Sequence, residues 1–194
     1  MINTIKNLTK AFIGESQARN RYVMFAKVAK KEGYEQISAI FTETANQEEE
    51  HAKQLFKMIN ELKKESNEDL NEIKVEASAP IILGNTLENL KSAIAGEKYE
   101  HESMYPDFAN LAEKEGLLAI ANRLKAIGIA ENHHEERYKK LLSELEAKTV
   151  FKKNQETSWV CRKCGYEHKG NTPANICPSC SHPIGYFQIK SENY

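Results

Sequence analysis

Glutamate and histidine occur together twice in the chain, each time three residues apart. The two motifs are Glu48-x-x-His51 and Glu131-x-x-His134. Residues three apart lie on one face of an α-helix, so the carboxylate and the imidazole can bind the same metal ion. One such motif often arises by chance in Glu-rich helices, but two motifs at matched positions of an internal repeat are specific. The spacing predicts metal ligands on two helices.

Two more glutamates follow a glycine at corresponding positions of the same repeat. Gly14-Glu15 matches Gly96-Glu97, and Glu100 lies one turn further on. They fall on the apolar, core-facing stripe of their helices, whereas the charges of an ordinary bundle lie on the solvated face. Carboxylates collected in one core need cations to neutralise them, and two glutamates with two Glu-x-x-His pairs are a known di-iron ligand set. The candidate ligands are Glu15, Glu48, His51, Glu97, Glu100, Glu131 and His134.

Four long helices are expected to carry these ligands. The apolar period predicts them over residues 4–31, 36–64, 86–114 and 117–147. Gly33 and Gly116 mark tight turns within two helical pairs, whereas Glu65 to Asn85 form a long connection that contains Pro80. Two short-looped hairpins joined by one long crossover predict an all-α ferritin-like four-helix bundle.

One extra residue interrupts the repeat in the third helix. The offset from Glu15 to Phe25 is ten residues, but the offset from Glu97 to the corresponding Phe108 is eleven. A helix often absorbs such an insertion as a π-bulge, and π-bulges cluster at functional sites. The sequence predicts one between Glu97 and Phe108.

All four cysteines lie near the C-terminus, in the knuckles Cys161-x-x-Cys164 and Cys177-x-x-Cys180. In a reducing compartment such pairs are metal ligands before they are disulfides. The spacing alone fits structural zinc and Fe(Cys)4 about equally. The neighbouring di-iron centre favours iron, because a di-iron oxidant needs an electron source and zinc has no redox chemistry.

Composition and charge indicate which partners, which location and which domain boundaries to expect. The 27 basic and 28 acidic residues nearly cancel and form no long basic stripe, so we expect no nucleic-acid partner. We expect no membrane span, because no apolar run is long enough, and a cytoplasmic location, because no signal-peptide core is found. A change of composition divides the chain into a bundle at 1–147, a linker at 148–157 and a metal-knuckle domain at 158–194.

Over nearly its whole length the chain resembles the rubrerythrin family. The resemblance rests on both Gly-Glu pairs, both Glu-x-x-His motifs, Glu97-x-x-Glu100 and the C-terminal knuckles. It implies a ferritin-like di-iron domain followed by a rubredoxin-like domain, with three iron ions per subunit. By resemblance, Glu48 and Glu131 bridge the two irons. Glu15 is then a terminal ligand of one iron, and Glu97 and His134 complete the other.

The resemblance also implies an exchange of ligands. The iron held by Glu15 would use Glu100 when oxidised and His51 when reduced. Tyr22 and Tyr105 match family tyrosines that hydrogen-bond to site carboxylates, although both are also readable as plain core aromatics. The remaining histidines lie outside the pattern and are expected to be solvated: His101, His133, His168 and His182.

The activity implied by the resemblance is that of a non-haem peroxidase, which reduces hydrogen peroxide to water in oxidative-stress defence. Electrons would return through the Fe(Cys)4 centre from an NADH-dependent flavoprotein reductase, from rubredoxin, or from both. The chain has no Gly-x-Gly-x-x-Gly fingerprint and is not expected to bind NADH itself. A homodimer or larger assembly is implied, because in the family one subunit's rubredoxin centre serves another's di-iron site.

Three other functions remain open from the sequence. The same ligands could serve a di-iron oxygen reductase. A ferritin-like protein of iron oxidation or storage would share the bundle, but gives no reason for the cysteines. A protein with structural zinc at both sites would have no redox function.

Overall fold

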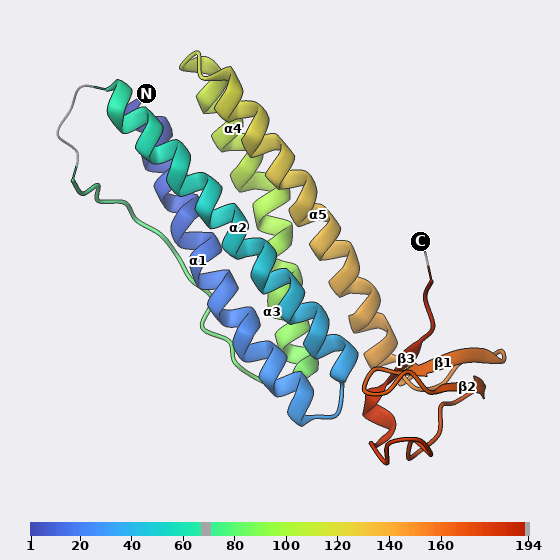
Figure 1. Cartoon of the computed structure of the whole chain (residues 1–194). Helices are drawn as coiled ribbons and strands as arrows, with labels where there is room; N and C mark the ends of the chain where they lie inside the picture. The colour runs from blue at the N-terminus through green and yellow to red at the C-terminus, as the bar shows by residue number, and fades with distance from the viewer. Residues whose placement is uncertain (67–70, 193–194) are drawn as a thin grey trace.

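The computed structural model describes residues 1–66 and 71–192, which form a long helical bundle with a small sheet-containing domain at one end (Figure 1). The helices are α1 (Ile2–Lys31), α2 (Glu35–Glu65), α3 (Thr86–Tyr99), η1 (Glu100–Met104), α4 (Tyr105–Lys114) and α5 (Leu118–Glu146). Because α3, η1 and α4 follow one another without a break, they form one rod, and four rods make the bundle. The predicted ferritin-like four-helix fold is confirmed.

Glycines reverse the chain within each helical hairpin. Gly33 follows α1 with φ of 84°, and Gly116 follows α4 with φ of 79°. Glycine adopts this left-handed conformation without steric cost. The N–H of Tyr34 then donates to the carbonyl oxygen of Ala29 at 2.9 Å, which closes the end of α1. Both predicted turns are confirmed.

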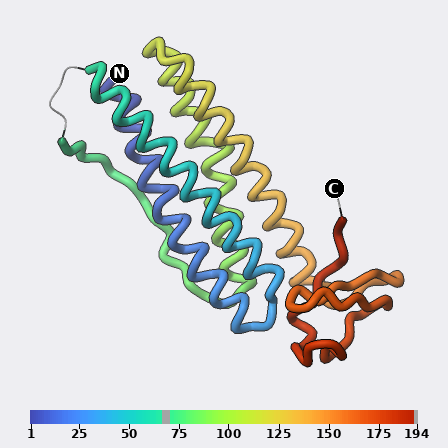
Figure 2. Tube along the Cα trace, viewed as in Figure 1, coloured from blue at the N-terminus to red at the C-terminus, as the bar shows by residue number. Residues whose placement is uncertain are grey.

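The crossover from α2 to α3 runs along the outside of the bundle (Figure 2), and its residues 76–84 lie over α1 and α3. Its residues 67–70 lie outside the described part of the chain. The crossover ends in a capping box, in which the Asn85 side chain accepts from the N–H of Glu88 and the Glu88 carboxylate accepts from the N–H of Asn85, each at 2.9 Å. This cap fixes where α3 begins.

Two apolar clusters fill the two ends of the bundle and leave a polar layer between them. One cluster contains Leu8, Leu55 and Leu124, and the other contains Phe25 and Phe41, all fully buried. Burying each such side chain contributes about 1.5–3 kcal/mol, which holds the rods around the polar layer. Within the described residues, no helix combines the length and apolar character needed to cross a bilayer.

A π-turn interrupts the third rod, as predicted. The turn η1 spans Glu100–Met104 and therefore lies between Glu97 and Phe108. Glu97 before it and Tyr105 after it are both fully buried. The extra residue thus lets side chains on both sides of the insertion face the core.

Three short strands form the sheet of the C-terminal domain: β1 (Thr157–Cys161), β2 (Glu167–Gly170) and β3 (Phe187–Ile189). The central strand β1 pairs antiparallel with both others, in the order β2-β1-β3. Trp159 and Phe187 are buried beside the cysteines and form a small core. The predicted boundaries 1–147, 148–157 and 158–194 stay a prediction, and residues 193–194 lie outside the described chain.

The small domain rests on the turn between α1 and α2. Gly185, in the short helix η2 (Ile184–Tyr186), lies so close to this turn that a Cβ there would be 2.2 Å from the carbonyl oxygen of Gly33. Phe151 stacks on Tyr34, with 6.1 Å between ring centroids and 3° between planes. These contacts place the cysteine knuckles beyond the end of the bundle.

Candidate metal centres

Carboxylates and imidazoles from all four rods meet in the polar layer. They form two groups, and within each group the ligand atoms lie within 4.8 Å of one another. The first group is Glu15, Glu48, His51 and Glu131, and the second is Glu48, Glu97, Glu131 and His134. Glu48 and Glu131 belong to both groups, so the two groups are adjacent and share two carboxylates.

The two histidines each face several carboxylates. His134 Nδ1 lies 2.8 Å from Glu131 Oε2, 3.1 Å from Glu48 Oε1 and 3.4 Å from Glu97 Oε2. His51 Nδ1 lies 2.9 Å from Glu131 Oε1 and 3.1 Å from Glu48 Oε2. The three-residue spacing places each imidazole beside the carboxylate of its own motif, because such residues share a helix face.

The converging atoms are buried but lack hydrogen-bond partners. Among the described residues this holds for Glu15 Oε2, Glu48 Oε1, Glu97 Oε2, Glu131 Oε1 and Oε2, and His134 Nδ1. His134 is close to its neighbours, yet its ring nitrogen is not aligned for a hydrogen bond with them. Each buried unsatisfied atom costs about 1–3 kcal/mol. The donor set therefore fits two metal ions that share Glu48 and Glu131.

The crowded carboxylates bind protons readily. Burial, and then the charge of Glu48, raises the pKa of Glu15 to about 7. Burial also raises the pKa values of Glu97 and Glu100 well above their usual range. Burial lowers the pKa of His134, but the close carboxylates of Glu131, Glu48 and Glu97 outweigh it and raise the value to about 12. Metal binding at this cluster must therefore displace protons.

Two buried tyrosines donate to the cluster. The Tyr22 hydroxyl donates to Glu97 Oε1, and the Tyr105 hydroxyl donates to Glu15 Oε1. Burial and then the charge of the bonded carboxylate raise the pKa of each tyrosine well above 10. Both hydroxyls therefore remain protonated donors, while their catalytic role stays a prediction.

Glu100 is the predicted ligand that falls in neither group. It begins η1 and is 6 % exposed. Its Oε1 lies 4.0 Å from the position that a Cβ would take at Gly14, so it faces α1 next to Glu15.

The expectation that His101 is solvated is wrong. His101 Nε2 lies 3.0 Å from Glu135 Oε2, and its side chain is only 16 % exposed. Lys139 lies 2.7 Å from the other oxygen of Glu135. This network ties η1 to α5 beside His134. The sequence did not predict the contact between His101 and Glu135. The extra residue in η1 interrupts the helical periodicity, which would otherwise show whether the side chain of residue 101 faces the core. His133 is exposed, as expected, and His168 and His182 are partly buried.

The cysteine sulfurs form a second candidate site. Sγ of Cys161 is 3.7 Å from that of Cys180, and Sγ of Cys164 is 3.6 Å from that of Cys177. These distances exceed the ~2.05 Å of a disulfide and match the ~3.8 Å edge of a tetrahedron with metal–sulfur distances of about 2.3 Å. A backbone N–H bond lowers the pKa of Cys164 to about 6, which favours the thiolate. Cys164 is also exposed, which leaves one edge of the site accessible.

Known proteins match the chain over nearly its whole length. The sequence profile named Rubrerythrin matches residues 6–142, and that named Rubrerythrin, rubredoxin-like domain matches residues 159–188. Rubrerythrin-1 of Clostridium acetobutylicum is 47% identical over 191 residues, which cover 98% of this chain and 96% of the relative. Rubrerythrin of Nitratidesulfovibrio vulgaris is 42% identical over 192 residues, with 98% and 96% covered.

Solved structures also match the chain over nearly its whole length. The structure of fully reduced, all-ferrous nigerythrin superposes with a TM-score of 0.63 at 32% identity, covering 96% of this chain and 86% of that one. The two candidate sites fit three iron ions per chain, two in the bundle and one in the knuckle. These relatives imply oxidoreductase activity, and the rubredoxin-like domain implies electron exchange with redox partners. The chain belongs to the rubrerythrin family of di-iron proteins.

Proposed function

We propose that the protein is a peroxidase that reduces hydrogen peroxide to two molecules of water with two electrons and two protons, in oxidative-stress defence. The observation that carries the proposal is the pair Glu48 and Glu131, shared by two buried ligand groups in a chain that also has a four-thiolate site. Two irons bound there would supply one electron each. Two-electron reduction breaks the O–O bond without releasing a hydroxyl radical.

The ligand roles are part of this proposal. Glu48 and Glu131 would be shared by the two metals, because both residues belong to both groups. Glu15 is the terminal carboxylate on one side, and Glu97 with His134 completes the other. The 2.8–3.4 Å separations around His134 Nδ1 support its place there.

His51 and Glu100 are proposed to exchange with the oxidation level. In this structure His51 belongs to the group of Glu15, whereas Glu100 lies just outside it. Neutral imidazole favours the ferrous state and carboxylate favours the ferric state. The exchange would therefore follow the oxidation level of the iron.

Two buried hydroxyls of the chain can donate hydrogen bonds to the carboxylates that would hold the irons. The hydroxyls of Tyr22 and Tyr105 donate to Glu97 and Glu15. They hold these carboxylates in place while charge changes at the centre.

The electron path is proposed to run between two copies of the chain. The knuckle domain contacts the turn at Gly33, and Glu15 to Lys31 spans roughly 24 Å of helix. The thiolate site is thus remote from the carboxylates of its own chain, which favours a homodimer or larger assembly. A cytoplasmic NADH-dependent flavoprotein reductase, rubredoxin, or both would reduce the thiolate site.

An anaerobic titration tests this proposal. Fully reduced protein with three irons per chain should take up one and a half molecules of hydrogen peroxide, because each peroxide accepts two electrons. Both chromophores should be oxidised, and a spin trap should detect no hydroxyl radical. Peroxide uptake without oxidation of the Fe(Cys)4 centre, or stoichiometric radical release, would contradict the proposal.

A further inference from the structure

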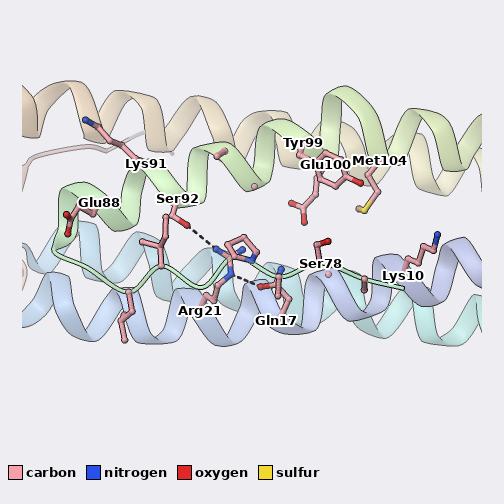
Figure 3. Close-up of a pocket in the computed structure, with 18 of the residues that line it drawn as sticks. Lys10, Gln17, Arg21, Ser78, Glu88, Lys91, Ser92, Tyr99, Glu100 and Met104 are labelled. Atoms are coloured by element: carbon pink, nitrogen blue, oxygen red, sulfur yellow. Dashed lines mark hydrogen bonds between the residues drawn. The ribbon is translucent and has the colours of Figure 1, made fainter. Parts of the chain in front are cut away.

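A cavity of about 1180 Å³ lies beside the metal centre and is lined by α1, by residues 76–84 of the crossover and by the rod of α3, η1 and α4 (Figure 3). Pockets for organic ligands commonly have roughly 300–1,000 Å³. A hydrogen peroxide molecule would fill only a small part of this volume.

Arg21 is a buried cation in the wall of this cavity. Its side chain is 7 % exposed, and it faces the cavity together with Gln17 and Ser92 (Figure 3). Its Nε donates to Gln17 Oε1 at 2.6 Å, and its Nη1 lies 3.5 Å from Ser92 Oγ. Its guanidinium also lies 5.6 Å from the ring centre of Tyr22 and 5.9 Å from that of Phe25.

Arg21 lacks a counter-ion. Within the described residues, its only hydrogen-bond partners are the neutral side chains of Gln17 and Ser92, and no carboxylate comes within 4.0 Å of its guanidinium. A guanidinium does not lose its proton in a protein, and it has five N–H donors. A charge buried without a partner is unfavourable. The remaining donors are therefore available to an anion.

The rest of the cavity is mainly apolar. Tyr99, Met104 and Phe108 line one side, and Ile82 and Leu83 of the crossover line another. Of the other charged side chains in the lining, Lys91 lies 2.9 Å from Glu146 and Glu88 belongs to the capping box. The remaining ones are Lys10, Glu76 and Glu100. A ligand that fits these walls has one anionic end and an apolar body.

Gly96 lines the end of the cavity that contains Arg21. A Cβ there would lie 3.6 Å from Nη2 of Arg21. Along α1, Lys10 and Arg21 both line the cavity, and eleven residues of helix span roughly 16 Å. The cavity is therefore long enough for an extended chain.

The geometry points to a binding site for a monocarboxylate with an unbranched apolar chain, whose carboxylate pairs with Arg21 and whose chain lies between α1, the crossover and Met104. A planar carboxylate can accept two parallel hydrogen bonds from a guanidinium. Glu100 lines the same cavity, so a bound chain would exclude water from that side of the metal centre. Binding at this site does not depend on which oxidant the metal centre reduces.

Calorimetric titration of the iron-loaded protein with dodecanoate, below its micelle concentration, tests this site. We expect one dodecanoate per chain and binding that is weaker by about 10–100-fold in Arg21→Gln, the range for loss of a charged hydrogen-bonded pair. Acetate has no chain and dodecanol has no charge, so both should bind much more weakly. Dodecanol should bind wild type and Arg21→Gln alike.

Two further variants complete the design. Arg19→Gln removes a cation from the same helix that is outside the cavity and pairs with Glu49, and it should bind dodecanoate like wild type. Ala95→Phe fills the cavity from an exposed position of α3 and should abolish binding even if Arg21→Gln fails to fold. Equal affinity in wild type, Arg21→Gln and Ala95→Phe would overturn the assignment. If the protein in its native assembly does not bind dodecanoate, the assignment is also overturned, because another subunit then covers the cavity.

Discussion

Glu131 contributes both carboxylate oxygens to the buried metal-binding layer, and neither has a hydrogen-bond partner among the described residues. We expect Glu131→Gln to lower metal affinity by more than the ~10–100-fold that follows loss of an outer hydrogen-bonding partner. Iron analysis should show loss from the bundle, while the red Fe(Cys)4 spectrum persists. Glu136→Gln changes an exposed glutamate of the same helix and should retain all iron. Equal iron content in the two variants would remove Glu131 from the site.

The hydroxyl of Tyr105 is predicted to stabilise the protein through Glu15. In Tyr105→Phe, Glu15 Oε1 loses its buried donor, which should cost about 1–3 kcal/mol in the free energy of unfolding. Tyr138→Phe is the matched control. The hydroxyl of Tyr138 is buried and near Thr44, but it has no aligned hydrogen bond within the described chain. Denaturant unfolding of both variants measures the difference, and equal losses would contradict the assigned role.

The site residues that could be predicted from the sequence are those whose helical spacing shows that the side chain faces the core. Glu131 and His134 fall on a continuous apolar stripe, so their burial follows from the period of α5. Arg21 and His101 could not be predicted in this way. Arg21 is a charged residue that a helix usually exposes, and the partner of His101 lies on another rod. Only the three-dimensional packing reveals either contact.

The π-turn is predicted to set the direction of the ligands at the scale of the helix. Deletion of Ser103, an exposed residue of η1, should restore a regular helix and rotate Glu97 and Glu100 by about 100° relative to Tyr105. We expect helical content to remain and bundle iron to fall sharply. Ser103→Ala keeps the register and should retain iron. Circular dichroism and iron analysis measure both, and full iron loading of the deletion would contradict this role.

The elements themselves were predictable because local signals agree with the tertiary fold. Gly33 and Gly116 end helices where the apolar stripes also end, and the two have the expected positive φ. The eleven-residue offset from Glu97 to Phe108 is enough to locate η1, because the matching offset in the first helix is one residue shorter. The path of the crossover was not predictable, since residues 71–84 have neither helical nor strand periodicity.

At the scale of the whole molecule, Gly185 is predicted to hold the two domains together. A methyl group at residue 185 would meet the carbonyl oxygen of Gly33 at 2.2 Å, so Gly185→Ala should push the knuckle domain off the bundle. We expect faster proteolysis between residues 147 and 157 and a larger radius of gyration in X-ray scattering. Lys169→Ala alters an exposed residue of the same domain and should change neither. An unchanged Gly185→Ala variant would show that this contact is dispensable.

This domain contact could not be anticipated from the sequence. Gly33 and Gly185 are about 150 positions apart, and each is interpretable locally as a turn residue. The two-domain order, in contrast, follows directly from composition, because helix formers give way to cysteine, proline and glycine near residue 150. Sequence thus predicts which domains exist, whereas their contact depends on surface shape.

The measurement that tests the peroxidase proposal most directly is stopped-flow oxidation of the fully reduced, iron-loaded protein by hydrogen peroxide and, separately, by oxygen. The peroxidase proposal predicts that peroxide oxidises both centres far faster than oxygen does, with the Fe(Cys)4 colour appearing as its electrons are withdrawn. If oxygen is as fast or faster, or if the Fe(Cys)4 colour does not respond, the protein is instead an oxygen reductase or an iron-handling protein.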